Sequence, residues 1–225
     1  MLVSIHQPHY LPWLRYFEKI ARADVFILLD TVEFTKNGWQ NRNKIKTPNG
    51  PALLTVPVHA HQDSILRDVT IDNRQPWRSK HRRTLEQSYG KAPYYGDHEA
   101  FLDDVYSQEW ERLTDLNAFM LAHFLRALGI ETPFVLASTL DVFGTGTERL
   151  INLIHAVGGT RYYSGAYALD TYLDAGLLHE AGIGLDLQEW HAPVYPQLHG
   201  EFESDLSIID LLMNRGPDSL RVLMP

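Results

Sequence analysis

The sequence has no cysteine, and this absence excludes several classes of protein. Disulfide-stapled folds, thiolate nucleophiles and zinc sites with sulfur ligands all need that side chain. Any catalysis must therefore use oxygen or nitrogen groups, or a metal held by histidines and carboxylates. Intrinsic disorder is excluded as well, because 44% of the 225 residues are hydrophobic and only 21% are charged, which is enough to build a core.

Long apolar runs are also missing. No stretch reaches the roughly 18 uninterrupted apolar residues that a membrane helix needs. Leu116–Leu136 comes nearest, and His123, Arg126 and Glu131 interrupt it. The first residues show no basic segment followed by a long apolar one, so a signal peptide is not expected. We therefore expect a cytoplasmic protein that does not insert into a membrane.

Negative charge is in excess, but it is unevenly distributed. The net charge is −8, yet Thr31–Lys91 contains eleven Lys and Arg against five Asp and Glu, so this segment carries +6 and the remainder −14. The basic segment is suited to an anionic ligand. A sequence pI of about 5.7 disfavours non-specific binding of polynucleotides, so we expect small phosphorylated ligands first.

The order of apolar segments predicts an α/β fold. Leu2–Ile5 is a short apolar run, Trp13–Arg22 has helical spacing, and Val25–Leu29 is a continuous apolar strand, which together predict a β-α-β unit. Continuous rather than alternating apolar strands indicate burial on both faces. We therefore predict a parallel sheet with helices on each side.

A helical segment interrupts this alternation of strands and helices. Trp77–Tyr89, His98–Tyr106 and Leu113–Leu128 have apolar residues three and four positions apart, and Gly129 is expected to end the last helix. The predicted architecture is therefore a Rossmann-like parallel sheet with a helical insertion around 76–130.

The β-α alternation resumes after the insertion. Thr147 is expected to cap a helix over Glu148–Val157, and Ala52–Val58 is predicted as a strand that follows the turn Thr47–Gly50. No repeat or linker is visible, so one domain over 1–225 is predicted. The remaining predicted elements are the strands Phe134–Ala137, Thr160–Ser164 and Leu185–Glu189, the segment Asp170–Ala181, and a final helix Ser204–Asn214.

Two histidines follow the first predicted strand, at the edge where ligands of such sheets bind. His6 and His9 stand three residues apart before a helix, a position from which imidazoles can polarise a phosphate. The arrangement is similar to the His-x-Gly-His motif of the nucleotidylyltransferase superfamily, with Pro8 in place of the glycine. The alternative is an ordinary proline-rich turn. Further binding candidates in this segment are Gln7, Tyr10 and Trp13.

The second predicted strand is followed by a segment dense in amides and cations. Thr31–Lys46 is predicted as a loop that binds a polar, anionic ligand, and the alternative is a solvated basic loop. Asp30 either orients a substrate amine or a Mg²⁺ ion, or closes the strand in an Asx turn. The candidates of the loop are Lys36 as a catalytic residue and Gln40, Asn41, Arg42 and Asn43 as binding residues.

For several other candidates a structural role is as well supported as a functional one, or better supported. His59 and His61 have a spacing compatible with a metal, but without further ligands nearby a loop role is favoured, and no metal site is predicted. Ser207, Asp210 and Asn214 share one helix face, where a capping role is at least as well supported. The remaining binding candidates are His81 in a basic helix start, Ser164 and Gly165 at a strand end, and Tyr195 and Gln197 in an aromatic polar loop.

The combined motifs resemble the WbqC-like protein family over nearly the whole chain. They are HQPHYLPW at 6–13, KIARADVFILLD at 19–30, WQNRNKIKTPNG at 39–50, LTVPV at 54–58, the segment from Trp77 to His81, YYSG at 162–165, YPQ at 195–197 and SIIDLLMNRG at 207–216. The resemblance implies a bacterial enzyme of surface-polysaccharide (O-antigen) or natural-product biosynthesis that transfers an amino acid, glycine in particular, to an amino sugar. Many members carry Asn where this chain has His9, which leaves His6 and Gln7 as the stronger candidates.

Two chemical schemes are consistent with these residues. In the first, ATP with Mg²⁺ activates a carboxylate as an acyl-adenylate and an amine then attacks it, with His6 and His9 stabilising phosphates and Lys36 and Arg42 holding phosphate or carboxylate. In the second, the donor is already activated, as an aminoacyl-tRNA or a nucleotide sugar. A non-catalytic ligand-binding protein of a polysaccharide assembly is the alternative outside enzymes.

Overall fold

The computed structural model describes residues 1–61 and 63–224, and its contacts group the chain into two compact units. The first unit comprises 1–7, 18–32 and 131–191, and the second comprises 8–17, 33–130 and 192–225. Neither unit is continuous in sequence. The predicted single domain over 1–225 stays a prediction.

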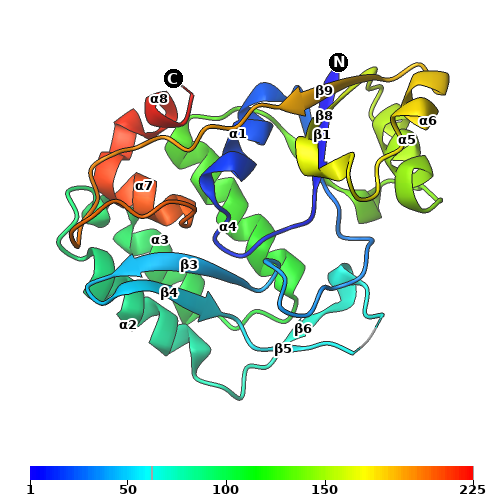
Figure 1. Cartoon of the computed structure of the whole chain (residues 1–225). Helices are drawn as coiled ribbons and strands as arrows, with labels where there is room; N and C mark the ends of the chain where they lie inside the picture. The colour runs from blue at the N-terminus through cyan, green and yellow to red at the C-terminus, as the bar shows by residue number, and fades with distance from the viewer. Residues whose placement is uncertain (62, 225) are drawn as a thin grey trace. The chain divides into compact units, whose positions relative to one another are not determined.

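The first unit is a five-stranded parallel sheet (Figure 1). The strand order is β7-β2-β1-β8-β9, so the five strands lie in the order third, second, first, fourth, fifth along the chain. This is the winding of a Rossmann-like sheet, as predicted. The strand bounds are β1 Leu2–His6, β2 Val25–Leu28, β7 Phe134–Leu136, β8 Arg161–Gly165 and β9 Gly184–Gln188.

Helices flank this sheet because alternate side chains of its strands point to opposite faces. Val3, Ile5 and Tyr162 point to one face, where they form an apolar core with Leu150 of α5 and Leu178 of α6. Tyr163 points the other way and meets Glu18 of α1. The helix bounds are α1 Leu14–Arg22, whose first residues belong to the second unit, α5 Gly146–Ala156 and α6 Ala175–Glu180, with 3-10 turns Ala137–Thr139 and Ala166–Ala168.

The second unit combines helices with two small antiparallel sheets. The predicted helical insertion is confirmed as α2 Trp77–Tyr89, α3 Tyr95–Ser107 and α4 Leu113–Leu128, and Gly129 ends α4 in the left-handed conformation with φ 72°. The remaining elements are β3 Arg42–Thr47 paired with β4 Gly50–Thr55, β5 Val58–His59 paired with β6 Thr70–Ile71, α7 Ile208–Arg215, α8 Ser219–Leu223, and 3-10 turns Leu66–Asp68 and Gly216–Asp218.

Four predicted elements differ from the structure. The predicted loop 31–46 ends earlier, because Arg42–Thr47 forms β3 and pairs with β4 around the turn at Pro48 and Asn49. The predicted strand 52–58 is two strands, β4 and β5. The last helix begins at Ile208, where Ser207 caps it by accepting a hydrogen bond from the Ile209 amide, and not at 204. The segment 170–181 is helical only from Ala175, where Asp174 caps α6.

We also expected Thr147 to cap α5, but it does not. It lies inside the helix, and its hydroxyl donates to the Tyr172 carbonyl at 3.1 Å and accepts from the Asp174 amide at 2.9 Å. The side chain therefore fixes the loop that follows β8 to the start of α5. This placement could not be deduced from the local sequence, because both partners come from a distant segment.

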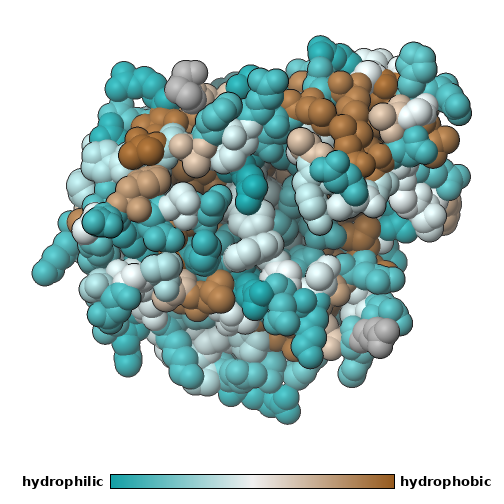
Figure 2. All heavy atoms as spheres, in the orientation of Figure 1, coloured by the Kyte–Doolittle hydropathy of each residue, from teal (hydrophilic) through white to brown (hydrophobic). Residues whose placement is uncertain are grey.

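The surface of the first unit carries exposed apolar side chains. Figure 2 shows apolar residues, in brown, gathered over the region of α5 and α6. Phe143, Leu169 and Leu177 are among the exposed large hydrophobic residues of this unit. No helix of the described residues is both long and apolar enough to cross a bilayer.

We predict that Gly159→Ala destabilises the sheet, because this glycine, in the turn between α5 and β8, lies against Val3 of β1 and Ile154 of α5. An added methyl would lie 2.5 Å from Val3 Cγ2 and 2.9 Å from the Ile154 carbonyl oxygen, and a backbone atom cannot rotate away. Overpacking of this kind costs about 1–3 kcal/mol of unfolding free energy, measurable by urea denaturation. Gly96→Ala in α3 is the control, since nothing lies within 4 Å of its added methyl; equal losses in both variants would contradict the prediction.

Candidate functional site

The order of the parallel strands reverses between β1 and β8. From β1 the chain winds to β2 and β7 on one side, and from β8 to β9 on the other. In sheets of this type, ligands bind beyond the carboxyl ends of the strands at this reversal. Ser4 is paired with Tyr163, so two residues later His6 and Gly165 end neighbouring strands. Four predicted site residues, His6, Gln7, Ser164 and Gly165, therefore stand at this edge.

The side chains at this edge differ in how they are held. His6 Nδ1 lies 3.2 Å from the Gln7 carbonyl oxygen. A carbonyl only accepts, so Nδ1 carries the proton and Nε2 is the basic atom of the neutral ring. The Ser164 hydroxyl is buried and hydrogen-bonds with Tyr162. Gly165 leaves its surroundings open, since an added methyl would meet only Gln188 Oε1 at 3.9 Å.

Asp30 follows β2 and is 1% exposed. Its Oδ1 accepts from the Ser138 amide at 2.9 Å, and its Oδ2 accepts from the Ser138 hydroxyl at 2.5 Å. Ser138 lies in the turn after β7, the strand beside β2, so the carboxylate joins the ends of two neighbouring strands. Both oxygens are thus used to position the sheet edge, and sequence reasoning did not identify Ser138.

A second buried carboxylate was also missed. Glu18 of α1 is 3% exposed and accepts from Tyr163 Oη at 2.9 and 3.2 Å and from Gln188 Nε2 at 2.5 Å. Arg22, one turn further along the helix, also donates to it. Burial, and then the hydrogen bond to Glu18, raise the pKa of Tyr163 above its usual value. The network holds β8 and β9 against α1 near their carboxyl ends, and no local pattern in the sequence signals it.

In the second unit, two predicted binding residues contact each other inside the core. Tyr10 Oη lies 2.8 Å from His81 Nδ1 and 2.6 Å from Tyr106 Oη. All three residues are buried, and burial lowers the pKa of His81 to about 4. The imidazole is therefore neutral at pH 7 and serves as an internal hydrogen-bonding group.

Three other predicted residues of this unit also hold the backbone. Asn43 is fully buried and donates to the Leu11 carbonyl at 2.7 Å. Tyr195 donates to the buried Asp210 carboxylate at 2.9 Å. Gln197 accepts from the Glu203 amide and donates to the Glu203 carbonyl, each at 2.9 Å. The loop that contains Tyr195 and Gln197 is thereby closed on itself and tied to α7.

Residues of the predicted anion-binding loop do line a cavity. Lys36, Asn41 and Arg42 contribute to its wall, and its volume is about 860 Å³. This size lies within the range of small-molecule sites, about 300–1,000 Å³. Asn41 donates to the Val56 carbonyl at 2.8 Å, and Gln40 is buried beside it. The remaining lining comes from Glu33, Phe34, Thr35, Asn37, Thr55, Val56, Pro57, Val58, Ala60, His61 and Asp63.

Aromatic rings of the first motif pack against the same loop. The Trp13 and Trp39 ring centroids are 4.9 Å apart, edge to face. His9 is 5% exposed. The centroid of its ring lies 5.3 Å from that of Trp13 and 5.4 Å from that of Tyr16. Such contacts are typical of stabilising aromatic pairs. His9 therefore belongs to a ring cluster of the second unit.

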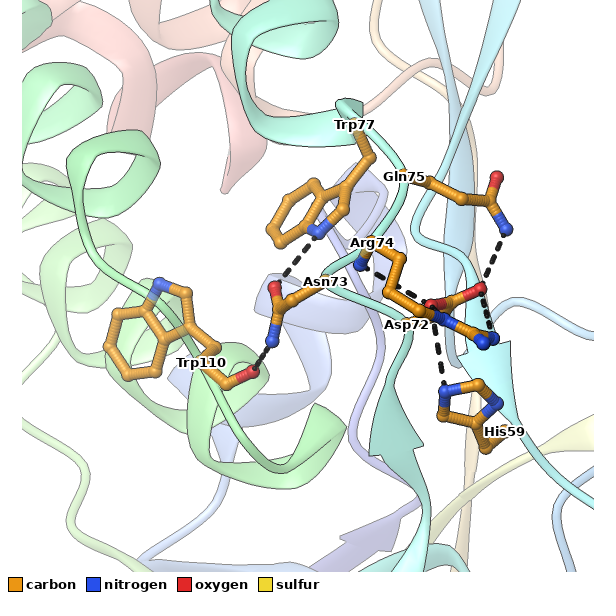
Figure 3. Close-up of polar contacts among 7 residues, drawn as sticks. All are labelled: His59, Asp72, Asn73, Arg74, Gln75, Trp77 and Trp110. Carbon is orange, nitrogen blue, oxygen red and sulfur yellow. Dashed lines mark hydrogen bonds and ion pairs between the residues drawn. The ribbon is translucent and has the colours of Figure 1, made fainter.

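His59 and His61 are not brought together as metal ligands. His59 instead lies 3.5 Å from Asp72, whose carboxylate also accepts from Arg74 and Gln75 (Figure 3). These hydrogen bonds hold the pKa of Asp72 well below its usual value. Within 1–61 and 63–224, no group of three or more histidines and carboxylates could hold a metal ion.

The buried His81 predicts a loss of stability in acid. Its folded pKa of about 4 lies below the unfolded value of about 6.5, so the unfolded chain binds more protons between these values. The contribution of neutral His81 to the unfolding free energy is complete above pH 6.5 and is lost as the pH falls towards 4. We expect unfolding free energy to fall by on the order of 2 kcal/mol from pH 7 to 4.5 for this group alone.

Urea denaturation at both pH values checks this expectation with His81→Gln, which cannot be protonated. The variant should lose less stability in acid than the natural chain. Some acid sensitivity should remain, because burial also lowers the pKa of His98 and of His123. These two side chains are neighbours, with His98 Nδ1 3.2 Å from His123 Nε2. If His81→Gln lost as much unfolding free energy between the two pH values as the natural chain, His81 would not be the source of the acid sensitivity.

Comparison with known proteins places the chain in a family. The WbqC-like protein family matches residues 7–222. A relative from Mycobacterium tuberculosis, described as uncharacterized protein Rv1507c, is 36% identical over 228 residues, which cover 97% of this chain and 97% of the relative. No solved structure matches. The extent of these matches, together with the motifs that carry the resemblance, shows that the chain belongs to the WbqC-like protein family.

Proposed function

We propose that the protein is a biosynthetic enzyme that forms an amide, by transferring an amino acid such as glycine to the amine of an amino sugar or a similar small molecule. One observation carries the proposal: the reversal of strand order in a Rossmann-like sheet, with His6 and Gln7 ending one strand and Ser164 and Gly165 ending its neighbour. Family membership supports the choice of reaction, and surface-polysaccharide or natural-product biosynthesis is the proposed setting.

The proposed reaction has two steps. The carboxylate of the amino acid attacks the α-phosphorus of ATP, which forms an acyl-adenylate and releases pyrophosphate. The acceptor amine then attacks the acyl carbon, AMP leaves, and the amine loses one proton. The proposal uses no thiol, in agreement with a chain that has no cysteine.

His6 is the residue assigned to the first step. In the imidazolium form of His6, Nε2 also carries a proton and can donate to the phosphate oxygens on which charge develops as pyrophosphate leaves. Nδ1 is already turned to the Gln7 carbonyl, which fixes the ring orientation. Mg²⁺, if required, would arrive with the ATP phosphates, since Mg²⁺ is usually bound by one or two carboxylates plus substrate phosphates.

The positions of Asp30 and Glu18 support a positioning role for both. Asp30 holds Ser138, and Glu18 holds Tyr163 and Gln188, so each carboxylate fixes the ends of strands that border the edge. A rigid edge matters because misplacement by about 1 Å can cost 10²-fold in rate.

A pyrophosphate-release assay tests the proposal. Purified protein receives ATP, Mg²⁺, glycine and a panel of amino sugars, and amide product is followed by mass spectrometry. We expect pyrophosphate and AMP to form together with the amide, and His6→Ala to lower the rate about 10²-fold or more, as loss of a transition-state donor does. His155→Ala, an exposed histidine of α5, is the matched control and should retain activity.

Three outcomes would count against parts of the proposal. Amide formation from a preactivated donor, an aminoacyl-tRNA or a nucleotide sugar, without ATP would exclude the adenylate step. Full activity of His6→Ala would exclude the role of His6. Saturable ligand binding without turnover under every condition would replace the enzyme by a binding protein of a polysaccharide assembly.

A further inference from the structure

The cavity of about 860 Å³ in the second unit is lined by Arg42, whose charge is not paired with a carboxylate of any residue that the structure describes. Arg42 Nη1 donates to Asn37 Oδ1 at 3.3 Å, and Nη2 donates to the Asn37 carbonyl. Its Cζ atom lies 5.9 Å from the centroid of the Trp39 ring. The guanidinium is therefore held by an amide, a carbonyl and an aromatic face, all of which are neutral.

Part of the hydrogen-bonding capacity of Arg42 is unused. Its Nε is shielded from solvent and has no acceptor among the described residues. No carboxylate of residues 1–61 or 63–224 pairs with either Arg42 or the exposed Lys36, which line the same cavity. An arginine in this state is oriented but still able to bind an anion, since guanidinium matches carboxylate and phosphate geometry.

A second cavity of this unit shows the opposite arrangement. Its volume is about 720 Å³, and it is lined by Arg74, Arg78 and Arg82. Arg74 donates to Asp72 at 2.8 Å, and Arg82 donates to Asp103 at 2.6 Å. Arg78 donates to the Gln108 carbonyl at 2.6 Å and lies 3.7 Å from Glu109. These three arginines already have anionic partners, so this cavity offers no comparable uncompensated cation.

Two acidic residues do line the first cavity. Glu33 and Asp63 are both exposed, and neither lies within 4.0 Å of a cationic nitrogen of Lys36 or Arg42. In water, two unit charges 4 Å apart attract each other by only about 1 kcal/mol, and exposed charges farther apart attract each other less. The two cations therefore keep most of their attraction for a ligand.

We infer that this cavity is a second ligand site, for a molecule that bears an oxyanion, with Arg42 and Lys36 as the residues that bind the anionic group. Trp39 is a positioning residue, because its ring supports the Arg42 guanidinium without neutralising it. The inference does not depend on the amide-forming activity, since binding can be measured without turnover.

Isothermal titration calorimetry on the full chain tests the inference. The probes are inorganic phosphate, pyrophosphate, AMP, adenosine and acetate, which separate phosphate from carboxylate and from the nucleoside ring. We expect saturable binding of at least one anionic probe and none of adenosine. Arg42→Ala should weaken that binding about tenfold or more, because the lost hydrogen bonds involve charged groups. Arg42→Lys should keep part of the affinity.

Arg74→Ala is the matched control, because it removes the same charge from the wall of the other cavity. It should change affinity less than twofold. Trp39→Ala should weaken binding and Trp39→Phe should restore most of it, a pattern that loss of bulk stability would not produce. Equal losses in Arg42→Ala and Arg74→Ala, or no saturable binding of any anion by the folded natural chain, would overturn the inference.

Discussion

The pairing of β1 on both of its edges is the constraint on which the first unit depends. β1 forms parallel ladders with β2 and with β8, while Val3 and Ile5 are buried in the core shared with α5. Because a shift of one residue would move Val3 and Ile5 to the opposite face, the register is strongly determined. The point at which β1 ends, and therefore the position of His6, is set by this buried strand and not by the loop that follows it.

Elements whose signal is local could be predicted from the sequence. α2 and α4 lie where helical spacing placed them, and β1 and β2 were found because two buried faces leave short apolar runs. β3 was missed for the opposite reason. Its residues, Arg-Asn-Lys-Ile-Lys-Thr, are typical of a loop, yet Asn43 and Lys46 are buried because partners elsewhere in the chain satisfy their polar groups.

The residues of the candidate sites also divide into those with a local sequence signal and those without one. Residues at strand ends, such as His6 and Gly165, follow from strand prediction and the general location of ligands in parallel sheets. Lys36, Asn41 and Arg42 were found because cations and amides cluster there in the sequence, and they do line one cavity. Glu18 and Ser138 could not be found, because their roles depend on which strands lie side by side. Chain order alone does not determine strand order.

Leu11 has φ 45°, in the left-handed region, although its side chain is fully buried. Asn43 supports this backbone by donating to the Leu11 carbonyl. A leucine in this conformation costs about 1–2 kcal/mol, so the position makes two opposed demands. Glycine would relax the backbone but leave a void in the core, whereas a β-branched residue would fill the space and increase the strain. Very few amino acids can satisfy both, so position 11 should tolerate little variation as the family diverges, even though the Leu11 side chain carries no polar group.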